Sequence, residues 1–310
     1  MSELEIRPGR AKTPGPAAAA GAASTAPVKA VEPPWSGRQA RAMDGEAMLR
    51  RMAGACLAQI VPNAAAIAGG SRDPEHVHQL RIGLRRLRSA ARGMAPFAAA
   101  MPHGWEPALM PVFDALGAAR DRHVRSTTLA RKLREAGAAL VDDAPPSEED
   151  ARALARRVRG AGFQGVVARL RSFADAPSHD AAGGAIEHLV ACMRKLHRQV
   201  TRHARHFDEL PFEAQHHARK RLKRLRYLAE FAAPAFARDD VRRWMRRAAP
   251  AQDALGRHID LVLAGRHFAA LAASDPAAWF AVGWLRAKSE CAARDAREAL
   301  LRLRDADGFW

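Results

Sequence analysis

The chain has 310 residues, of which 48 % are hydrophobic, enough to bury the core of one large domain or two units. Its formal net charge of +17 points to a polyanionic partner: nucleic acid, an anionic membrane surface or a phosphate polymer. Cys56, Cys192 and Cys291 lie far apart, which argues against a disulfide framework and a zinc knuckle. No apolar run reaches the length of a transmembrane helix, about 18 residues. The acidic N-terminus does not look like a secretory signal. We therefore expect a cytoplasmic protein without a metal or cofactor.

In chain order, residues 1–37 are rich in Ala, Pro and Gly and predict a disordered tail. From 38 to 310, apolar residues recur every three or four positions and never alternate over a strand length, so the fold class is predicted to be all-α. Ser71–Glu75, with capping residues and Pro74, predicts a helix start. Helices are expected to break at clusters of Gly and Pro: Gly69–Gly70, Pro102–Gly104, Pro145–Pro146, Ala176–Pro177, Gly183–Gly184, Pro211 and Pro234.

Two sequence blocks occur twice, in the same order and at nearly the same spacing. The pattern H-x-x-R-x-x-x-(R/K)-R-L-R runs from His78 to Arg88 and again, 138 residues later, from His216 to Arg226. A second element, from Pro111 to Asp121, returns 139 residues later from Pro250 to Asp260. We interpret the chain as internally duplicated, with repeats at about 40–175 and 180–308. A period this long favours two helical bundles over a solenoid.

Each copy of the first block predicts a helix with a column of cations beside an apolar stripe. Such a column costs a few tenths of a kcal/mol per like-charged pair, yet it offers a cation about every 5–6 Å, a good match for a chain of phosphates. Histidine can add a pH-dependent contact, with affinity rising from about pH 8 to 6. The first column extends to Arg92, whereas Glu230 stands at that position in the second. The candidate ligands are His78, Arg81, Arg85, Arg88, His216, Arg219, Lys223 and Arg226.

Other charged positions allow two interpretations. A basic stripe precedes the second copy, and it either lines the same groove or forms a solvated face: Arg194, Arg198 and Arg202. Four acidic residues are expected to orient arginines or cap helices rather than bind metal: Asp114, Asp121, Asp253 and Asp260. Gly117 and Gly256 are expected to allow close helix packing or to end a turn.

These motifs resemble the conserved histidine α-helical domain family, CHAD, whose L-G-x-x-R-D element is similar to Leu116–Asp121 and Leu255–Asp260. The resemblance spans about residues 40–308. It implies two four-helix bundles about a pseudo-two-fold axis, a basic groove or pore between them, and polyphosphate binding by the eight candidate ligands. Some family members associate with polyphosphate granules and others with polyhydroxyalkanoate granules. Lys220 replaces a usually apolar residue, which predicts looser packing in the second half. The tail is too short for the triphosphate-tunnel (CYTH) barrel that many relatives carry.

Three functions remain to be weighed. An enzyme is disfavoured because the chain has no phosphate-binding loop and because His76 with His78, like His216 with His217, cannot face one metal from a helix. Phosphorylation of His78 or His216 stays open. Nucleic acid is the main alternative to polyphosphate, although Tyr227 is the sole aromatic residue of the motif helices that could stack on a base. A granule scaffold is the third, since the tail and the apolar segment at Trp279, Phe280 and Trp284 could contact a partner or a granule surface. These aromatics are nevertheless expected to be core residues.

Overall fold

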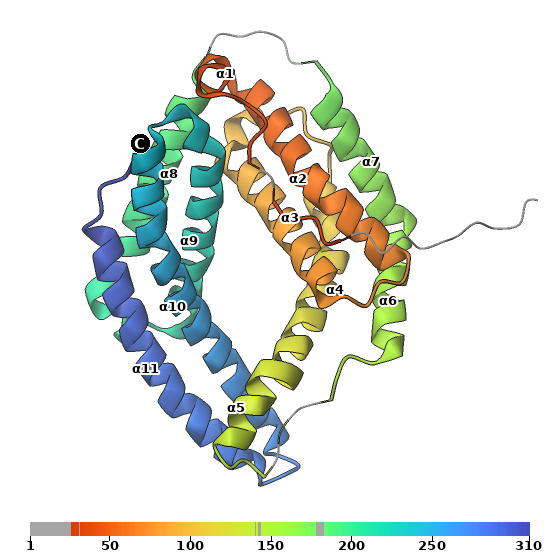
Figure 1. Ribbon diagram of the computed structural model, residues 1–310, viewed down its shortest axis with the longest axis vertical. Coiled ribbons are helices and arrows are strands. Elements are labelled where there is room, and N and C mark those ends of the chain that lie inside the picture. Colours follow the sequence, from red (N-terminus) through yellow and green to blue (C-terminus); the bar gives the residue numbers. More distant parts are fainter. Residues whose placement is uncertain (1–25, 31, 140, 142–143, 178–182) are drawn as a thin grey trace, which may run out of the picture.

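The secondary structure of the described residues is helical throughout (Figure 1), which confirms the all-α prediction. The structure is a computed structural model that describes residues 26–30, 32–139, 141, 144–177 and 183–310. Its helices are α1 (Gly37–Ala42), α2 (Gly45–Ala68), α3 (Pro74–Gly93), α4 (Trp105–Val124), α5 (Ala130–Glu135), α6 (Glu148–Arg159), α7 (Ala161–Asp175), α8 (Ala185–Thr201), α9 (Phe212–Ala232), α10 (Arg238–Leu271) and α11 (Ala278–Arg304). Short helical turns η1 (Ala95–Phe97), η2 (Arg125–Leu129), η3 (Ala204–Glu209) and η4 (Ala233–Ala235) lie between them.

Local sequence signals account for most helix ends. Every predicted Gly and Pro cluster lies between α-helices, so these predictions are confirmed. Asp73 caps α3, its Oδ1 accepting a hydrogen bond from the Glu75 amide at 2.8 Å, and Pro74 occupies the first turn as expected. Ser147 and Asp150 form a capping box at the start of α6. The α10–α11 connection was not predicted, because Asp275 and Pro276 give a weaker break signal.

The helices pack in two groups that are consecutive in the chain (Figure 1). In the N-terminal group α2 packs on α3 and α7, and α4 packs on α3 and α7, with α6 against α2 and α4. In the C-terminal group α9 packs on α8 and α10, and α11 packs on α8 and α10. Each group therefore closes a ring of four long helices around its own apolar side chains.

The two groups share one large core and meet again at a smaller one. The large core includes buried leucines of both motif helices, α3 and α9. Gly93 lets α3 approach α9, because a Cβ there would lie 2.6 Å from Leu228 Cδ2. The smaller apolar cluster joins η2 and α5 to the end of the α10–α11 hairpin, through residues such as Leu133, Phe268 and Leu285.

The described residues before α1 pack against the helices, although the sequence placed them in the tail. Asn63 Nδ2 donates to the Val28 carbonyl at 2.8 Å, and the Val28 amide donates back to Asn63 Oδ1 at 3.3 Å. Trp35 is buried and stacks on Phe231 with ring centroids 6.3 Å apart. A Pro- and Ala-rich stretch has no periodicity to reveal such contacts. Residues 1–25 of the predicted tail lie outside the described residues.

Candidate functional site

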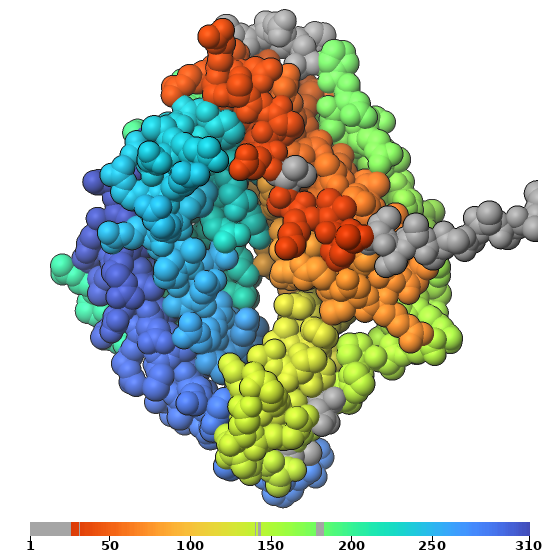
Figure 2. Space-filling model, viewed as in Figure 1, coloured from red at the N-terminus to blue at the C-terminus, as the bar shows by residue number. Residues whose placement is uncertain are grey.

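The two copies of the motif lie on α3 and α9, which contact each other across the two groups of helices. All eight candidate ligands are half-buried, so each is held by the fold while keeping access to solvent. Figure 2 shows the molecular surface hollowed between the groups, with α3 and α4 on one side and α9 and α10 on the other. The motif residues therefore lie on the two helices that approach each other from opposite sides of the molecule.

Four cations from the two helices influence one another's protonation. The pKa of Arg81 is lowered by burial and by Arg219, and that of Arg85 by burial and by Arg81. The pKa of Lys223 falls to about 6, because the amine is buried and because Arg219 and Arg85 are near it. These effects cross from α3 to α9 in both directions. We call Arg81, Arg85, Arg219 and Lys223 the central cluster.

A phenylalanine of α4 supports the α3 side of the site. The guanidinium carbons of Arg81, Arg85 and Arg88 lie 5.4, 5.9 and 5.0 Å from the centre of the Phe113 ring. A ring face attracts such cations, so Phe113 holds three of the motif arginines together. The sequence did not assign this residue to the site; its position in the repeated Pro111–Asp121 element was the available signal.

The glycine and aspartate of the second repeated element serve the same two arginines. A Cβ at Gly117 would lie 3.3 Å from Arg81 Nη2, and one at Gly256 would lie 3.9 Å from Arg219 Nη2. Both glycines lie inside long helices, so they make room for a guanidinium and do not end a turn. Arg219 Nη2 donates to Asp260 Oδ1 at 3.0 Å, which bears out the expectation that this aspartate orients an arginine.

The central arginines keep unused hydrogen-bonding capacity. Arg81 Nε and Arg219 Nε are buried and have no hydrogen-bond partner within the described residues. Because the Nε atoms are shielded from solvent, an external acceptor would reach these half-buried side chains through their other guanidinium nitrogens. These basic side chains with unfilled donors form a candidate anion-binding site.

Comparison with known proteins identifies the family. The CHAD domain family model matches residues 51–269. The chain belongs to the CHAD domain family. It is also similar to the crystal structure of the CHAD domain from the plant Ricinus communis, with a TM-score of 0.70, 27% sequence identity, and coverage of 91% of this chain and 99% of that chain. No curated protein matches the sequence.

The outer ligands of this CHAD domain already have carboxylate partners. Glu106 of α4 lies 2.8 Å from Arg88 Nε and 2.6 Å from Arg92 Nη2, so the two arginines share it. On α9, Arg226 Nε lies 3.3 Å from Glu230 Oε1. These carboxylates occupy part of the hydrogen-bonding capacity of the outer arginines, as Asp260 does for Arg219 in the central cluster.

The two motif histidines favour their neutral form. The pKa of His78 is lowered by burial and by Arg120, and that of His216 by burial and by Lys220. Both histidines therefore become charged only at a pH below the ordinary pKa of histidine. The rise in affinity predicted between about pH 8 and 6 should accordingly occur at lower pH. Lys220 itself is exposed, so the expectation that it loosens the packing of the second half is wrong.

A buried arginine of the motif has a structural role that the sequence did not reveal. Arg86 is 1% exposed, and its Nη1 donates to Gln59 Oε1 at 3.3 Å. Its Nε lies 3.7 Å from Glu230 Oε2, and its guanidinium lies 4.9 Å from the Phe231 ring centre. Arg86 thus ties α3 to α9 and to α2.

The other predicted positions do not join the central cluster. The three arginines of the basic stripe on α8 are exposed, and their place in a binding site stays a prediction: Arg194, Arg198 and Arg202. Four arginines of α10 are also exposed: Arg242, Arg243, Arg246 and Arg247. Within the described residues, no group of three His, Cys, Asp or Glu side chains could hold a metal ion. In the same part of the chain, no helix is long and apolar enough to cross a membrane.

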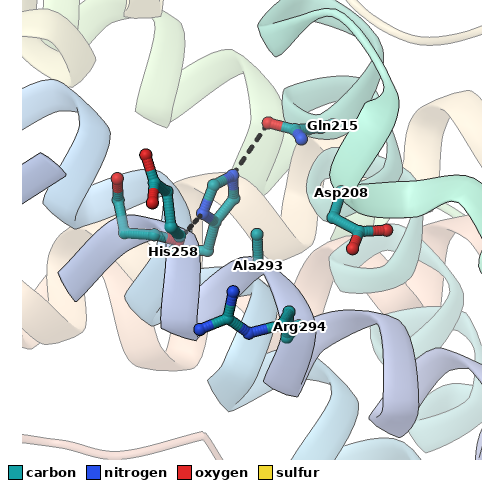
Figure 3. A pocket seen from close by; sticks show the side chains of 7 residues that line it. Asp208, Gln215, His258, Ala293 and Arg294 are labelled. Carbon is teal, nitrogen blue, oxygen red and sulfur yellow. Dashed lines mark hydrogen bonds between the residues drawn. The ribbon is translucent and has the colours of Figure 1, made fainter. Parts of the chain in front are cut away.

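A pocket of about 330 Å³ in the C-terminal group contains a buried histidine (Figure 3). His258 Nε2 is 2.8 Å from Gln215 Oε1, and its Nδ1 is 3.0 Å from the Ser289 carbonyl. The Gln215 side chain also donates to the Phe207 carbonyl at 3.0 Å. This network joins α9, α10, α11 and η3, so it fixes the start of motif helix α9.

Proposed function

We propose that this CHAD domain binds inorganic polyphosphate, without catalysis, through the central cluster and the neighbouring motif residues. The convergence of four half-buried basic side chains from two contacting helices, Arg81 and Arg85 of α3 with Arg219 and Lys223 of α9, carries the proposal. Gathering three half-buried guanidinium groups, beside a lysine amine that gains a proton when an anion binds, costs free energy that a bound polyanion would recover. Arginine offers paired donors to phosphate oxygens, and a repeating phosphate chain can meet cations of both helices.

Internal duplication with a pseudo-two-fold axis is part of this proposal. Two rings of four helices, α2–α3–α4–α7 and α8–α9–α10–α11, would be the two bundles. In both, a glycine of the second element lies next to the motif arginine: Gly117 at Arg81 and Gly256 at Arg219. The hollow between the groups would then be a basic groove, with equivalent ligands on opposite walls. A linear polymer of identical units suits such walls.

Nucleic acid is the less favoured partner because the nearby aromatic rings are not free to stack on bases. Tyr227 is 5% exposed. Phe113 is half-buried and already faces three guanidinium groups. Single-stranded nucleic acids gain much of their affinity from stacking, whereas polyphosphate needs only charge and hydrogen bonds. The proposal places the protein in the cytoplasm, at polyphosphate or polyhydroxyalkanoate granules, where such a polymer could be stored or organised.

A competition titration tests the proposal. Labelled long-chain polyphosphate is bound at fixed, near-physiological salt and challenged with DNA and RNA at equal phosphate concentration. We expect nucleic acid to displace little of the polymer. Equal displacement would make the cluster a general cation surface and move nucleic acid to first place.

Paired charge-reversal variants locate the site. Arg81→Glu with Arg219→Glu should abolish binding while the circular dichroism of the helices stays native. Arg246→Glu with Arg247→Glu changes the net charge by the same amount at exposed positions of α10 and should retain most of the affinity. If both pairs lose equal affinity, net charge alone drives binding and the site assignment is wrong.

A further inference from the structure

The end of the α10–α11 hairpin exposes large apolar side chains. Within the described residues, the large hydrophobic side chains that are exposed are Leu263 at 42%, Trp279 at 60% and Phe280 at 44%. All three belong to this hairpin, and Trp279 and Phe280 are neighbours in the first turns of α11. The interpretation of these two aromatics as core residues is therefore wrong. Their exposure costs solvation free energy, which suggests that something covers them.

The two aromatics project from packed helices at one extremity of the molecule. Ala278 and Ala281, which flank them in sequence, are buried in the small apolar cluster with Phe268 and Leu133. Figure 1 shows the hairpin end beside α5, at one end of the longest axis of the molecule. A projecting end suits contact with an extended surface, whereas a peptide partner is usually held in a groove.

Exposed lysines belong to the two elements that meet at this end of the molecule, α5 and α11. Lys132 and Lys288 are exposed, and Lys288 Nζ lies 5.5 Å from the Trp284 ring centre. The whole chain has a net charge of +17, so a negatively charged surface attracts it from a distance. Exposed aromatic residues and lysines at the same end of a basic protein are a combination that favours the headgroup region of an anionic bilayer.

We propose that the α10–α11 end docks peripherally on anionic phospholipid bilayers, with Trp279 and Phe280 entering the headgroup region. This contact is separate from the polyphosphate site on α3 and α9, so one molecule could hold a polymer at a membrane surface. The contact is a surface one, since no helix within the described residues has the properties needed to cross the bilayer.

Vesicle co-sedimentation tests the proposal. The full chain should sediment with vesicles of phosphatidylcholine and phosphatidylglycerol, much less with phosphatidylcholine alone, and less as salt rises. Trp279→Ser with Phe280→Ser should weaken the partition about tenfold or more, with polyphosphate affinity unchanged. Leu263→Ser is the matched control, and vesicle binding should persist in this variant. Gly265 of α10 lies against Leu285 of α11, and this register places Leu263 about 12 Å from Trp279 along the hairpin.

A second readout separates insertion from simple charge attraction. Vesicles with brominated acyl chains should quench tryptophan fluorescence on binding, and Trp279→Phe should retain binding while losing most of the quenching. Equal sedimentation of wild type and the double serine variant would overturn the proposal. A second result would also overturn it: the wild type does not bind vesicles but forms a dimer in sedimentation velocity, and the double serine variant does not form this dimer.

Discussion

Helices α3 and α9 carry the same motif but surround its cations differently. On α3, three arginines gather around the ring of Phe113, and Arg81 has no ion pair among the described residues. On α9, Arg219 is paired with Asp260, and a lysine, Lys223, takes the place of Arg85. At the centre of the site, Arg81 and Arg85 therefore stay charged, whereas Arg219 is partly neutralised by Asp260 and Lys223 can lose a proton. Farther out, both columns have a carboxylate partner, Glu106 for Arg88 and Glu230 for Arg226. The repeated motif thus places candidate ligands at equivalent positions of the two helices, but their side chains and partners differ.

The largest expected effect concerns the last position of the motif, Arg92 on α3 and Glu230 on α9. Glu230→Gln removes the carboxylate beside the buried Arg86, and we expect a loss of about 3–5 kcal/mol in the free energy of unfolding. Arg92→Gln, at an exposed pair, should cost less than about 1 kcal/mol. Urea denaturation followed by circular dichroism measures both. Equal losses would show that Glu230 has no special structural role.

The next effect compares the two equivalent arginines as ligands. Arg81→Ala should weaken polyphosphate binding about 10- to 100-fold, the value of one or more charge-assisted hydrogen bonds. Arg219→Ala should weaken it less, because Asp260 already occupies part of that guanidinium. In an Asp260→Asn background the two losses should become similar. Isothermal titration with polymer of one length measures them; a larger loss at Arg219 would reverse the comparison.

Lysine at position 223 makes binding depend on pH. Its pKa of about 6 leaves the Lys223 amine mostly neutral above pH 6 in the free protein. A bound polyanion raises this pKa, so binding is accompanied by the uptake of as much as one proton. Affinity should fall as pH rises from about 6 to 9. Lys223→Arg should flatten the profile, and Arg85→Lys should steepen it. A profile that is unchanged in both variants would exclude Lys223 from the site.

The same lysine affects the stability of the free protein. The fold lowers its pKa from 10.5, the ordinary value for a lysine, to about 6, so between these values the unfolded chain binds a proton that the folded chain lacks. The contribution of Lys223 therefore makes the free energy of unfolding rise with pH from about 6 to 10.5. The difference between wild type and Lys223→Met across this range isolates it.

The smallest expected effect is at the paired glycines. Gly117→Ala places a methyl group 3.3 Å from Arg81 Nη2, which must shift, and affinity should fall a few-fold. Gly256→Ala meets Arg219 at an ordinary contact distance of 3.9 Å and should leave affinity unchanged. Both changes favour the helix by up to about 1 kcal/mol, so a rise in thermal stability accompanies them. Equal binding losses would place both glycines at equally tight contacts.

Periodicity and repetition in the sequence predict much of this molecule. The all-α fold, the helix breaks and the family followed from spacing, because Gly, Pro and apolar residues act locally. The half-buried position of all eight ligands agrees with their place at the edge of an apolar stripe. Arg86 was included in the motif without a role, although it lies five residues after Arg81 and therefore points about 140° round the helix, away from the cation column.

Features that depend on contacts between distant segments were not predicted. Phe113 reaches the α3 arginines from the next helix, and Glu230 reaches Arg86 from the other half of the chain. Trp35 lies in a stretch without periodicity and is nevertheless buried. In each case one side chain makes the contact, and no spacing within its own segment records it. The exposure of Trp279 and Phe280 was missed for a related reason, since aromatic residues near a helix are most often buried.

The small apolar cluster beneath the α10–α11 end has a kinetic consequence. It holds α5 to the hairpin with far fewer buried side chains than the large core, so local opening there costs less than global unfolding. Amide hydrogens of α5 should exchange faster than those of α2 and α3. Opening would part the two groups of helices at one end while Gly93 and Leu228 keep α3 and α9 together. A long polymer could then enter the hollow sideways, and its loading would not depend on finding a free chain end.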